Sequence, residues 1–456
     1  MMSAEFVLPS DFWSHFVAHR WGKSPLVIKK PFAKSLATAQ EVFLAIRHAT
    51  DQFRASDSNV RIRFYMEDGF SLQPAPYLPD SSDHSATDYA ARVTRKLSGQ
   101  CFGLILNGFQ AYDVELWRRV REFLRGLLTE ISIQPMVEGV LFFGNYDKTP
   151  RGIHKDPVDI FLFVIEGRKK MYLWPEESFP DGDHDARLDS DFAILRRDAL
   201  ILEGEPGDVI YWPSSYWHVG EAVGGLSLSL SLALKPLQPA SEILDHLKQY
   251  IEEFVNGSLD GVNFPTTPKQ LEESAEMISK FTKLGIKALQ KASRDSDFAQ
   301  AIQVSWLDRL TGSGSDPVPP PLPWKELADD AIVQGSLEYP ILWIPVANHQ
   351  LACSANGHAF TIPADPKIIE LLERLNKGEV VQVKNLIQEH TGVTRSDGAE
   401  FSTLPEGIRT VLSKLYSLRA ISEKGDGPSI PTAQPGRVTL RPEFAEAQPG
   451  RIEKHE

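Results

Sequence analysis

The sequence predicts an α+β protein in which a jelly roll of short β-strands is followed by a helical segment and a small mixed domain. Three observations predict this fold class. Short apolar stretches separated by Gly- and Pro-containing turns are dense between residues 101 and 235. Amphipathic helical patterns dominate 237–311. Over 336–424, two strand patterns and three helical patterns follow in an order that suits a winged-helix-like domain.

The composition limits the class of protein. The chain has 456 residues, which favours several domains over one core, and its 42% apolar and 24% charged residues are ordinary for a folded protein. A net charge of −13 argues against direct nucleic-acid binding, which uses a basic face. Two cysteines, Cys101 and Cys353, exclude a disulfide scaffold and a Cys-rich zinc site. Neither a signal-peptide pattern nor an apolar run of roughly 20 residues is visible, so we expect a cytoplasmic protein with no membrane partner.

Helices and strands are both expected in the first part of the chain, before the main run of strands. We expect a helix over 11–20, a strand over 25–29, a helix over 40–48 and a turn-rich stretch over 56–85. A buried strand, CFGLILNGF, then precedes an amphipathic helix, DVELWRRVREFLRGLLTEI. The strands that follow are VEGVLFFGNY, VDIFLFVIEG, KKMYLWP, LEGEPGDVIYWPSSYWH and LSLSLSLAL. The last alternates Leu with Ser, which predicts one buried face and one hydroxyl-lined face.

Beyond Pro236 the pattern becomes helical. A helix capped by Ser241 and ended by Gly257 is expected, then helices over 268–293 and 295–310, whose apolar stripes favour a homodimer. The winged-helix-like stretch has 10 acidic and 9 basic residues, which favours a packing or protein-contact role over DNA reading. The expected domain boundaries are 1–236 for the strand-rich domain, 237–311 for the helical segment, 312–335 for a Pro-rich linker, 336–424 for the winged-helix-like domain and 425–456 for a disordered tail.

Three residues in the strand-rich region have the chemistry of a metal site. His154 and Asp156 stand two residues apart, so their side chains share a face if the segment is a strand. His218, at the end of PGDVIYWPSSYWH, is the best candidate for a third ligand. Two histidines and one carboxylate form the facial triad of non-haem Fe(II) oxygenases, which leaves coordination positions open for a cosubstrate and O₂.

Lys169 is a candidate partner for a ligand bound at the metal site. Lys169 follows Asp156 by 13 residues, and a turn or bulge at 167–168 lets it face the barrel interior. A buried ammonium requires a partner, which a metal-bound dicarboxylate supplies through its far end. The alternative is a solvated turn formed by Arg168, Lys169 and Lys170.

The stretches HKDPVDIFLFVIEGRKKMYLWP and GDVIYWPSSYWHVGEAVGGLSLSLSLAL together resemble the JmjC-type, cupin-fold 2-oxoglutarate oxygenases. Within that group the sequence is most similar to the bacterial ribosomal oxygenases and the cupin-like protein hydroxylases. The resemblance implies a double-stranded β-helix and a reaction in which 2-oxoglutarate and O₂ yield succinate, CO₂ and a hydroxylated product. The site residues implied or suggested are His154, Asp156 and His218 as catalytic Fe(II) ligands, and Lys169, Ser231, Arg151 and Asn145 as contacts of 2-oxoglutarate.

The sequence therefore predicts an Fe(II)- and 2-oxoglutarate-dependent dioxygenase that hydroxylates a side chain of a protein or peptide, with a basic ribosomal protein as one such partner. The extra domains favour a macromolecular substrate, by analogy between architectures. Two alternatives remain at this point. One is a biosynthetic oxygenase acting on a peptide or small molecule, and the other is a non-catalytic cupin-fold binding or regulatory protein.

Overall fold

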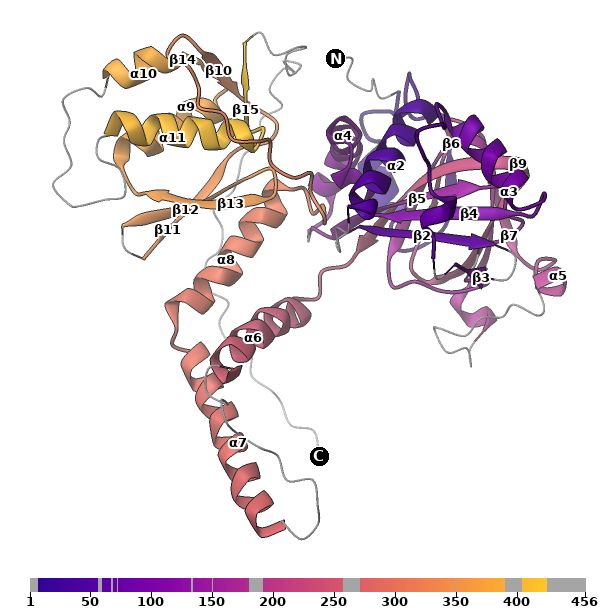
Figure 1. Ribbon diagram of the computed structural model, residues 1–456, viewed down its shortest axis with the longest axis horizontal. Helices are drawn as coiled ribbons and strands as arrows, with labels where there is room; N and C mark the ends of the chain where they lie inside the picture. Colours follow the sequence, from indigo (N-terminus) through magenta and orange to yellow (C-terminus); the bar gives the residue numbers. More distant parts are fainter. Residues whose placement is uncertain are drawn as a thin grey trace.

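The computed structural model describes residues 7–55, 60–66, 69–71, 73–132, 134–149, 151–179, 192–256, 271–347, 349–389 and 404–424. A strand-rich unit is built from the first half of the chain, and a smaller unit is built from the end of the described chain, with three helices between them in sequence (Figure 1). The predicted tail at 425–456 lies outside the described residues. No helix in the described part is long and apolar enough to span a membrane.

The strand-rich unit is an antiparallel sheet of nine strands, in the order β1-β8-β6-β9-β5-β4-β2-β3, with β7 also paired to β6. The predicted strand-rich core is thereby confirmed. The strands β6 and β9 form its longest pair, and both contribute residues to the site described below. The bounds are β1 Leu26–Ile28, β2 Arg61–Met66, β3 Gly69–Phe70, β4 Phe102–Asn107, β5 Met136–Gly144, β6 Asp159–Pro175, β7 Leu200–Gly204, β8 Val209–Trp212 and β9 Tyr216–Lys235.

Four helices pack against one side of this sheet, and a short helix, α5 (Phe192–Leu195), follows β6. The four are α1 Phe12–His19, α2 Ala39–Arg54, α3 Ala86–Lys96 and α4 Val114–Glu130. Leu228 and Leu230 of β9 join Phe161 of β6 in the core under these helices. The serine face of β9 is buried as well, since Ser229 is 0% exposed. The expectation of a single buried face is thus corrected: the leucines face the helices and the serines face the inside of the barrel.

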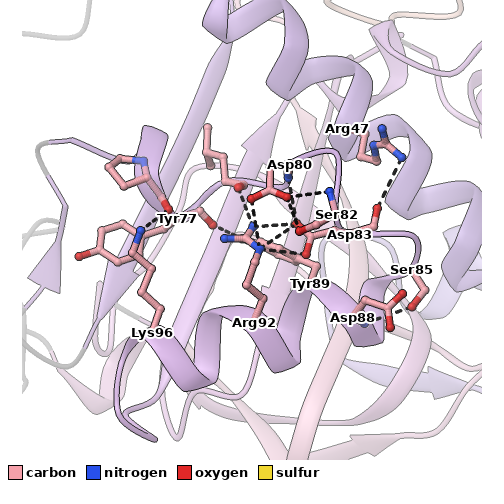
Figure 2. Close-up of polar contacts among 12 residues, drawn as sticks. Arg47, Tyr77, Asp80, Ser82, Asp83, Ser85, Asp88, Tyr89, Arg92 and Lys96 are labelled. Carbon is pink, nitrogen blue, oxygen red and sulfur yellow. Dashed lines mark hydrogen bonds and ion pairs between the residues drawn. The ribbon is translucent and has the colours of Figure 1, made fainter.

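A buried ion pair secures the segment that precedes α3. Asp83 is 1% exposed, and Arg92 Nη2 donates to its Oδ2 at 2.7 Å and to the Leu78 carbonyl at 2.9 Å (Figure 2). Ser85 Oγ accepts from the Asp88 backbone N–H at 3.1 Å and so caps the helix. The stretch 56–85, which was expected to be turn-rich, also contains the strands β2 and β3.

The three helices after the sheet are α6 Pro239–Asn256, α7 Leu271–Ala292 and α8 Ser296–Thr311. Helix α6 begins at Pro239, so Ser241 lies inside it and donates to Gln238 Oε1 at 3.2 Å. Ser241 is therefore not the cap that the sequence suggested. Gly257, the expected helix stop, lies outside the described residues. Figure 1 shows α6 and α7 extending away from both units.

The C-terminal unit has its own buried core. It contains a sheet in the order β14-β10-β15 and a second sheet in the order β11-β12-β13. Strand β10 falls inside the stretch expected to be linker. The winged-helix-like topology stays a prediction. The bounds are β10 Ile332–Gly335, β11 Leu342–Val346, β12 Gln350–Ala355, β13 His358–Pro363, α9 Pro366–Asn376, β14 Val380–Gln382, α10 Val383–Glu389, α11 Leu404–Ser417 and β15 Ile421–Glu423.

The start of the Pro-rich stretch lies against the large sheet. Val137 of β5 donates its N–H to the Gly314 carbonyl at 2.7 Å, and Asp316 donates its N–H to the Val137 carbonyl at 3.0 Å. Gln110 Nε2 donates to the Asp316 carbonyl at 3.3 Å. These hydrogen bonds attach the beginning of the Pro-rich stretch to the strand-rich unit.

Candidate metal centre and cosubstrate pocket

Two histidines that are far apart in sequence are joined by their backbones. The His154 N–H donates to the His218 carbonyl at 3.1 Å, and the His218 N–H donates to the His154 carbonyl at 2.8 Å. This isolated antiparallel bridge sets the two ring centroids 4.3 Å apart. The expected strand through 154–156 is absent, because the segment pairs only at His154. The backbone bridge to β9, and not a regular strand, therefore positions this ligand.

The ligand atoms of His154, Asp156 and His218 all lie within 4.8 Å of one another. Asp156 Oδ2 is 3.4 Å from His154 Nε2 and 3.7 Å from His218 Nε2. His154 Nδ1 lies 2.9 Å from the Gly152 carbonyl. A carbonyl only accepts, so Nδ1 carries the proton and the Nε2 lone pair is directed at the centre. The three side chains can thus hold one metal ion.

The electrostatics of the centre also suit a cation. Burial and the neighbouring His154 lower the pKa of His218 to about 3, so its ring is neutral at pH 7. Burial opposes ionisation of Asp156, but the neighbouring His154, His218 and Arg151 hold its pKa well below the usual range. A neutral imidazole and an ionised carboxylate are the protonation states that ligate metals.

A bulge in β6 directs Lys169 into the barrel. The pairing of β6 with β9 shifts register between Val164 and Glu166 and again between Glu166 and Arg168. Gly167, with φ of +73°, occupies this irregularity, and a Cβ there would lie 2.1 Å from the Leu226 carbonyl oxygen. In a regular strand Leu162 would share its face with even-numbered residues. The shift instead puts Leu162 and Lys169 on the same cavity wall.

Lys169 is buried and does not belong to a solvated turn, unlike its neighbour Arg168. Arg168 and Lys170 lie near Glu203, at 3.3 and 3.8 Å. Lys169 itself is 1% exposed, and its Nζ donates to Tyr146 Oη at 2.5 Å. Burial lowers the pKa of the Lys169 ammonium to about 7. Lys169 is therefore a buried amine whose charged form is stabilised by an incoming anion.

One cavity of about 280 Å³ connects the metal-ligand triad to Lys169. Its apolar wall includes Phe142, Leu162, Met171 and Trp212. Six of the seven residues expected from the sequence line it, namely Arg151, His154, Asp156, Lys169, His218 and Ser231. The cavity therefore offers metal donors at one place and a buried amine at another, within reach of one small ligand.

The seventh residue, Asn145, is placed elsewhere. Its Oδ1 accepts from the Phe102 N–H at 2.8 Å, and it is absent from the cavity lining. The expected contact of Asn145 with the cosubstrate is corrected accordingly. Asp159 does not line the cavity either: it accepts from Tyr211 Oη at 2.8 Å and from the Ser214 N–H at 2.9 Å.

Several cavity residues were missed by the sequence analysis. Thr149 and Gly220 are joined by the Thr149 N–H donating to the Gly220 carbonyl at 2.8 Å. A Cβ on Gly220 would lie 3.2 Å from Lys169 Nζ, so the glycine makes room for the lysine. Arg63 of β2 and Glu138 of β5 also line the cavity. The alternation in RIRFYM and VEGVLFF was the available signal, because alternate residues of a strand share a face.

Comparisons with known proteins place this site in a class. The JmjC domain model matches residues 116–240, which include all three triad residues, Lys169 and Ser231. The resemblance to the JmjC family that the sequence predicted is thereby confirmed.

Individual relatives show the same likeness. Ribosomal oxygenase 2 of Rattus norvegicus is 27% identical over 137 residues, or 28% of this chain and about a quarter (26%) of that protein's length. YcfD, a ribosomal oxygenase from Escherichia coli, matches with a TM-score of 0.48 and 15% identity, over 93% of this chain and 100% of that one. One of its structures is a complex with cobalt and 2-oxoglutarate.

Proposed function

We propose that this protein is an Fe(II)- and 2-oxoglutarate-dependent dioxygenase that hydroxylates a side chain of a protein or peptide. The observation that carries the proposal is the single cavity that joins the triad of His154, Asp156 and His218 to the buried amine of Lys169. The JmjC domain match over the same residues supports it.

The donor set fits the metal. Two imidazole nitrogens and one carboxylate oxygen are the facial triad of non-haem iron, in which three positions stay open. In this proposal His154 Nε2, Asp156 Oδ2 and His218 Nε2 hold Fe(II). When bound, iron and 2-oxoglutarate together supply the oxidative chemistry: O₂ is consumed, 2-oxoglutarate is converted to succinate and CO₂, and one oxygen atom enters a C–H bond of the substrate.

The other cavity residues would bind and orient 2-oxoglutarate. Lys169 holds the far carboxylate of 2-oxoglutarate, and Tyr146, which already contacts Lys169 Nζ at 2.5 Å, lies beside that carboxylate. Ser231 offers a hydroxyl from the neighbouring wall. Leu162 and Met171 line the space between and keep water from it.

We also propose the partners expected from the sequence. A protein substrate suits a chain with additional domains, and the name of the rat relative supports a ribosomal protein as a candidate. Large apolar side chains of α6 and α7 are exposed, among them Leu244 at 60% and Ile286 at 50%, which supports a homodimer through these helices. A cytoplasmic location stays a prediction from the sequence.

The direct test is succinate formation by purified protein supplied with Fe(II), ascorbate and 2-oxoglutarate. We expect turnover that is lost in His154→Ala and retained in His246→Ala, a matched change in α6. Residue-resolved mass spectrometry of added protein extracts then finds a side chain heavier by one oxygen atom, about 16 Da.

The same assay separates the alternatives. Turnover with a small-molecule extract and none with proteins favours a biosynthetic oxygenase. Absence of succinate both without and with either extract, in protein that still binds metal, contradicts the proposal and favours a cupin-fold binding protein.

A further inference from the structure

Two arginines and one engaged carboxylate line the same cavity as the metal-ligand triad and Lys169. Arg63 projects from β2, and Arg151 lies in the loop that precedes His154; both line the cavity. Glu138 also lines it, but its Oε1 already accepts from Arg61 Nη2 at 2.9 Å and from Asn107 Nδ2 at 3.0 Å. We call Arg61, Arg63, Glu138 and Arg151 the rim.

The rim is adjacent to the metal ligands. Arg151 Nη1 donates to Asp156 Oδ1 at 3.2 Å, while the other oxygen of this carboxylate, Oδ2, faces the two histidines. Arg63 Nη2 donates to Asn107 Oδ1 at 3.0 Å. A group held between Arg63 and Arg151 therefore lies next to the reacting centre.

The arginines of the rim are close enough to repel one another. Partial burial, together with the charges of Arg151 and Arg61, lowers the pKa of the Arg63 guanidinium, and the neighbouring Glu138 opposes this only in part. An additional cation brought to this rim would meet the same repulsion, whereas an anion would relieve it.

The net charge of the cavity lining also favours an anionic group over a cationic one. Among the described residues that line the cavity, the charged ones are Arg63, Arg151 and Lys169 against Glu138 and Asp156. Under the proposed function, a divalent metal and a dicarboxylate cosubstrate cancel each other. The site then keeps a positive excess, and Arg61 at its rim adds to it.

Resting on that proposed function, we propose that the side chain presented for hydroxylation is acidic, an Asp or Glu whose carboxylate is held by Arg63 and Arg151. Guanidinium groups bind carboxylates through paired N–H donors, so two of them also orient the adjacent C–H bond. A basic side chain is disfavoured, because Glu138, the carboxylate of the rim, is occupied by Arg61. In a ribosomal protein the modified position would then be one of its acidic residues.

The experiment measures binding without turnover. The full-length protein is loaded with Zn(II), which undergoes no redox chemistry, and with 2-oxoglutarate; N-acetyl-aspartate amide and N-acetyl-arginine amide are then titrated in saturation-transfer NMR. We expect the aspartate probe to bind at least tenfold more tightly, with a preference that shrinks as salt rises. Arg63→Gln should reduce the preference at least fivefold, and Arg168→Gln, an exposed arginine paired with Glu203, should leave it unchanged.

The opposite outcomes are equally clear. Tighter binding of the arginine probe, equal affinities including no binding of either probe, or a preference unaffected by Arg63→Gln overturns the acidic-substrate proposal. Binding of 2-oxoglutarate is recorded in the same samples before either probe is added. Its absence contradicts the proposed oxygenase, so the two failures are distinguishable.

Discussion

The position of Lys169 in the fold determines its protonation state. A fully buried ammonium is costly, and burial lowers the pKa of Lys169 to about 7. Below that pH the cavity presents a cation, and above it a neutral amine. A carboxylate that binds here stabilises the charged form and raises the pKa of Lys169, so binding is linked to proton uptake.

The affinity for 2-oxoglutarate should therefore depend on pH. Because the free lysine loses its proton as pH rises through about 7, affinity should be greatest below pH 7 and should fall above it, approaching tenfold per pH unit. Isothermal titration calorimetry of Zn(II)-loaded protein between pH 6.5 and 9 measures this slope. Lys169→Met should bind weakly at every pH with no such slope, and a flat profile in the unmodified protein would contradict the assigned role.

Residue types and spacing sufficed to find most of the candidate site. His154, Asp156, His218 and Lys169 were predictable because few other side chains bind metals or dicarboxylates. Asn145 was misplaced, since its bond to the Phe102 N–H depends on the pairing geometry of β4 with the chain after β5, which no local pattern records.

At the scale of elements, the bulge in β6 decides what enters the cavity. An uninterrupted strand would place Arg168 and Lys170, and not Lys169, on the face of Leu162. The register shift around Gly167 exchanges the two faces. The long pairing with β9 supports both halves of β6 and therefore keeps the shift at one position.

Gly167→Ala should destabilise the protein and weaken 2-oxoglutarate binding together. The positive φ costs any L-residue about 1–2 kcal/mol, and the new Cβ also meets the Leu226 carbonyl oxygen at 2.1 Å, so we expect a loss of about 3 kcal/mol. Gly224→Ala is the matched control: it has the same φ of +73°, but its nearest atom is 3.9 Å away, on Arg168.

Chemical denaturation measures both variants. Equal losses of unfolding free energy in the two proteins, with 2-oxoglutarate affinity preserved in Gly167→Ala, would contradict the role given to the bulge.

Long periodic elements were more predictable than short ones. The helix α4 and the Leu–Ser alternation of β9 follow directly from their periods of 3.6 and two. Strand β2 was missed because it is only six residues long and lies in a turn-rich stretch. Strand β6 was predicted as two strands because a glycine can mark either a bulge or a turn. Ser241 has the chemistry of a cap, but α6 continues upstream to Pro239.

At the scale of the whole molecule, Arg121 of α4 joins the two units. It is 2% exposed, and its Nη2 donates to the Thr311 carbonyl at 2.7 Å while its Nη1 donates to Asn356 Oδ1 at 2.8 Å. Its guanidinium also lies over the rings of Trp117 and Tyr339, with centroids at 4.3 and 3.7 Å. Burial lowers the pKa of Arg121 to about 10, so it stays charged at pH 7.

Arg121→Leu should loosen this junction. The change leaves the acceptors of Thr311 and Asn356 without their donor, which costs roughly 2–4 kcal/mol of unfolding free energy. Limited proteolysis should then cut faster within 312–335. Arg118→Leu, in the same helix and paired with the nearby Glu115, is the control. Unchanged proteolysis in Arg121→Leu would show that other contacts hold the units together.

Domain order was accessible from the sequence, but the junction was not. Changes of period mark where strands give way to helices, and proline density marks the linker. Arg121 contacts Thr311 and Asn356, which lie 190 and 235 residues further along the chain. No local sequence pattern indicates that these segments are in contact. Strand β10 was hidden for the same reason, because its partners β14 and β15 lie far along the chain.

In the proposed site, one molecule of 2-oxoglutarate spans the distance between the metal and Lys169. The most direct measurement is the affinity for 2-oxoglutarate with and without Zn(II), in the unmodified protein and in Lys169→Met. We expect the metal to tighten binding of 2-oxoglutarate at least tenfold, and removal of either the metal or the lysine to weaken it. An affinity that is the same with and without metal would show that 2-oxoglutarate does not bridge the metal and Lys169, and that the assigned binding mode is wrong.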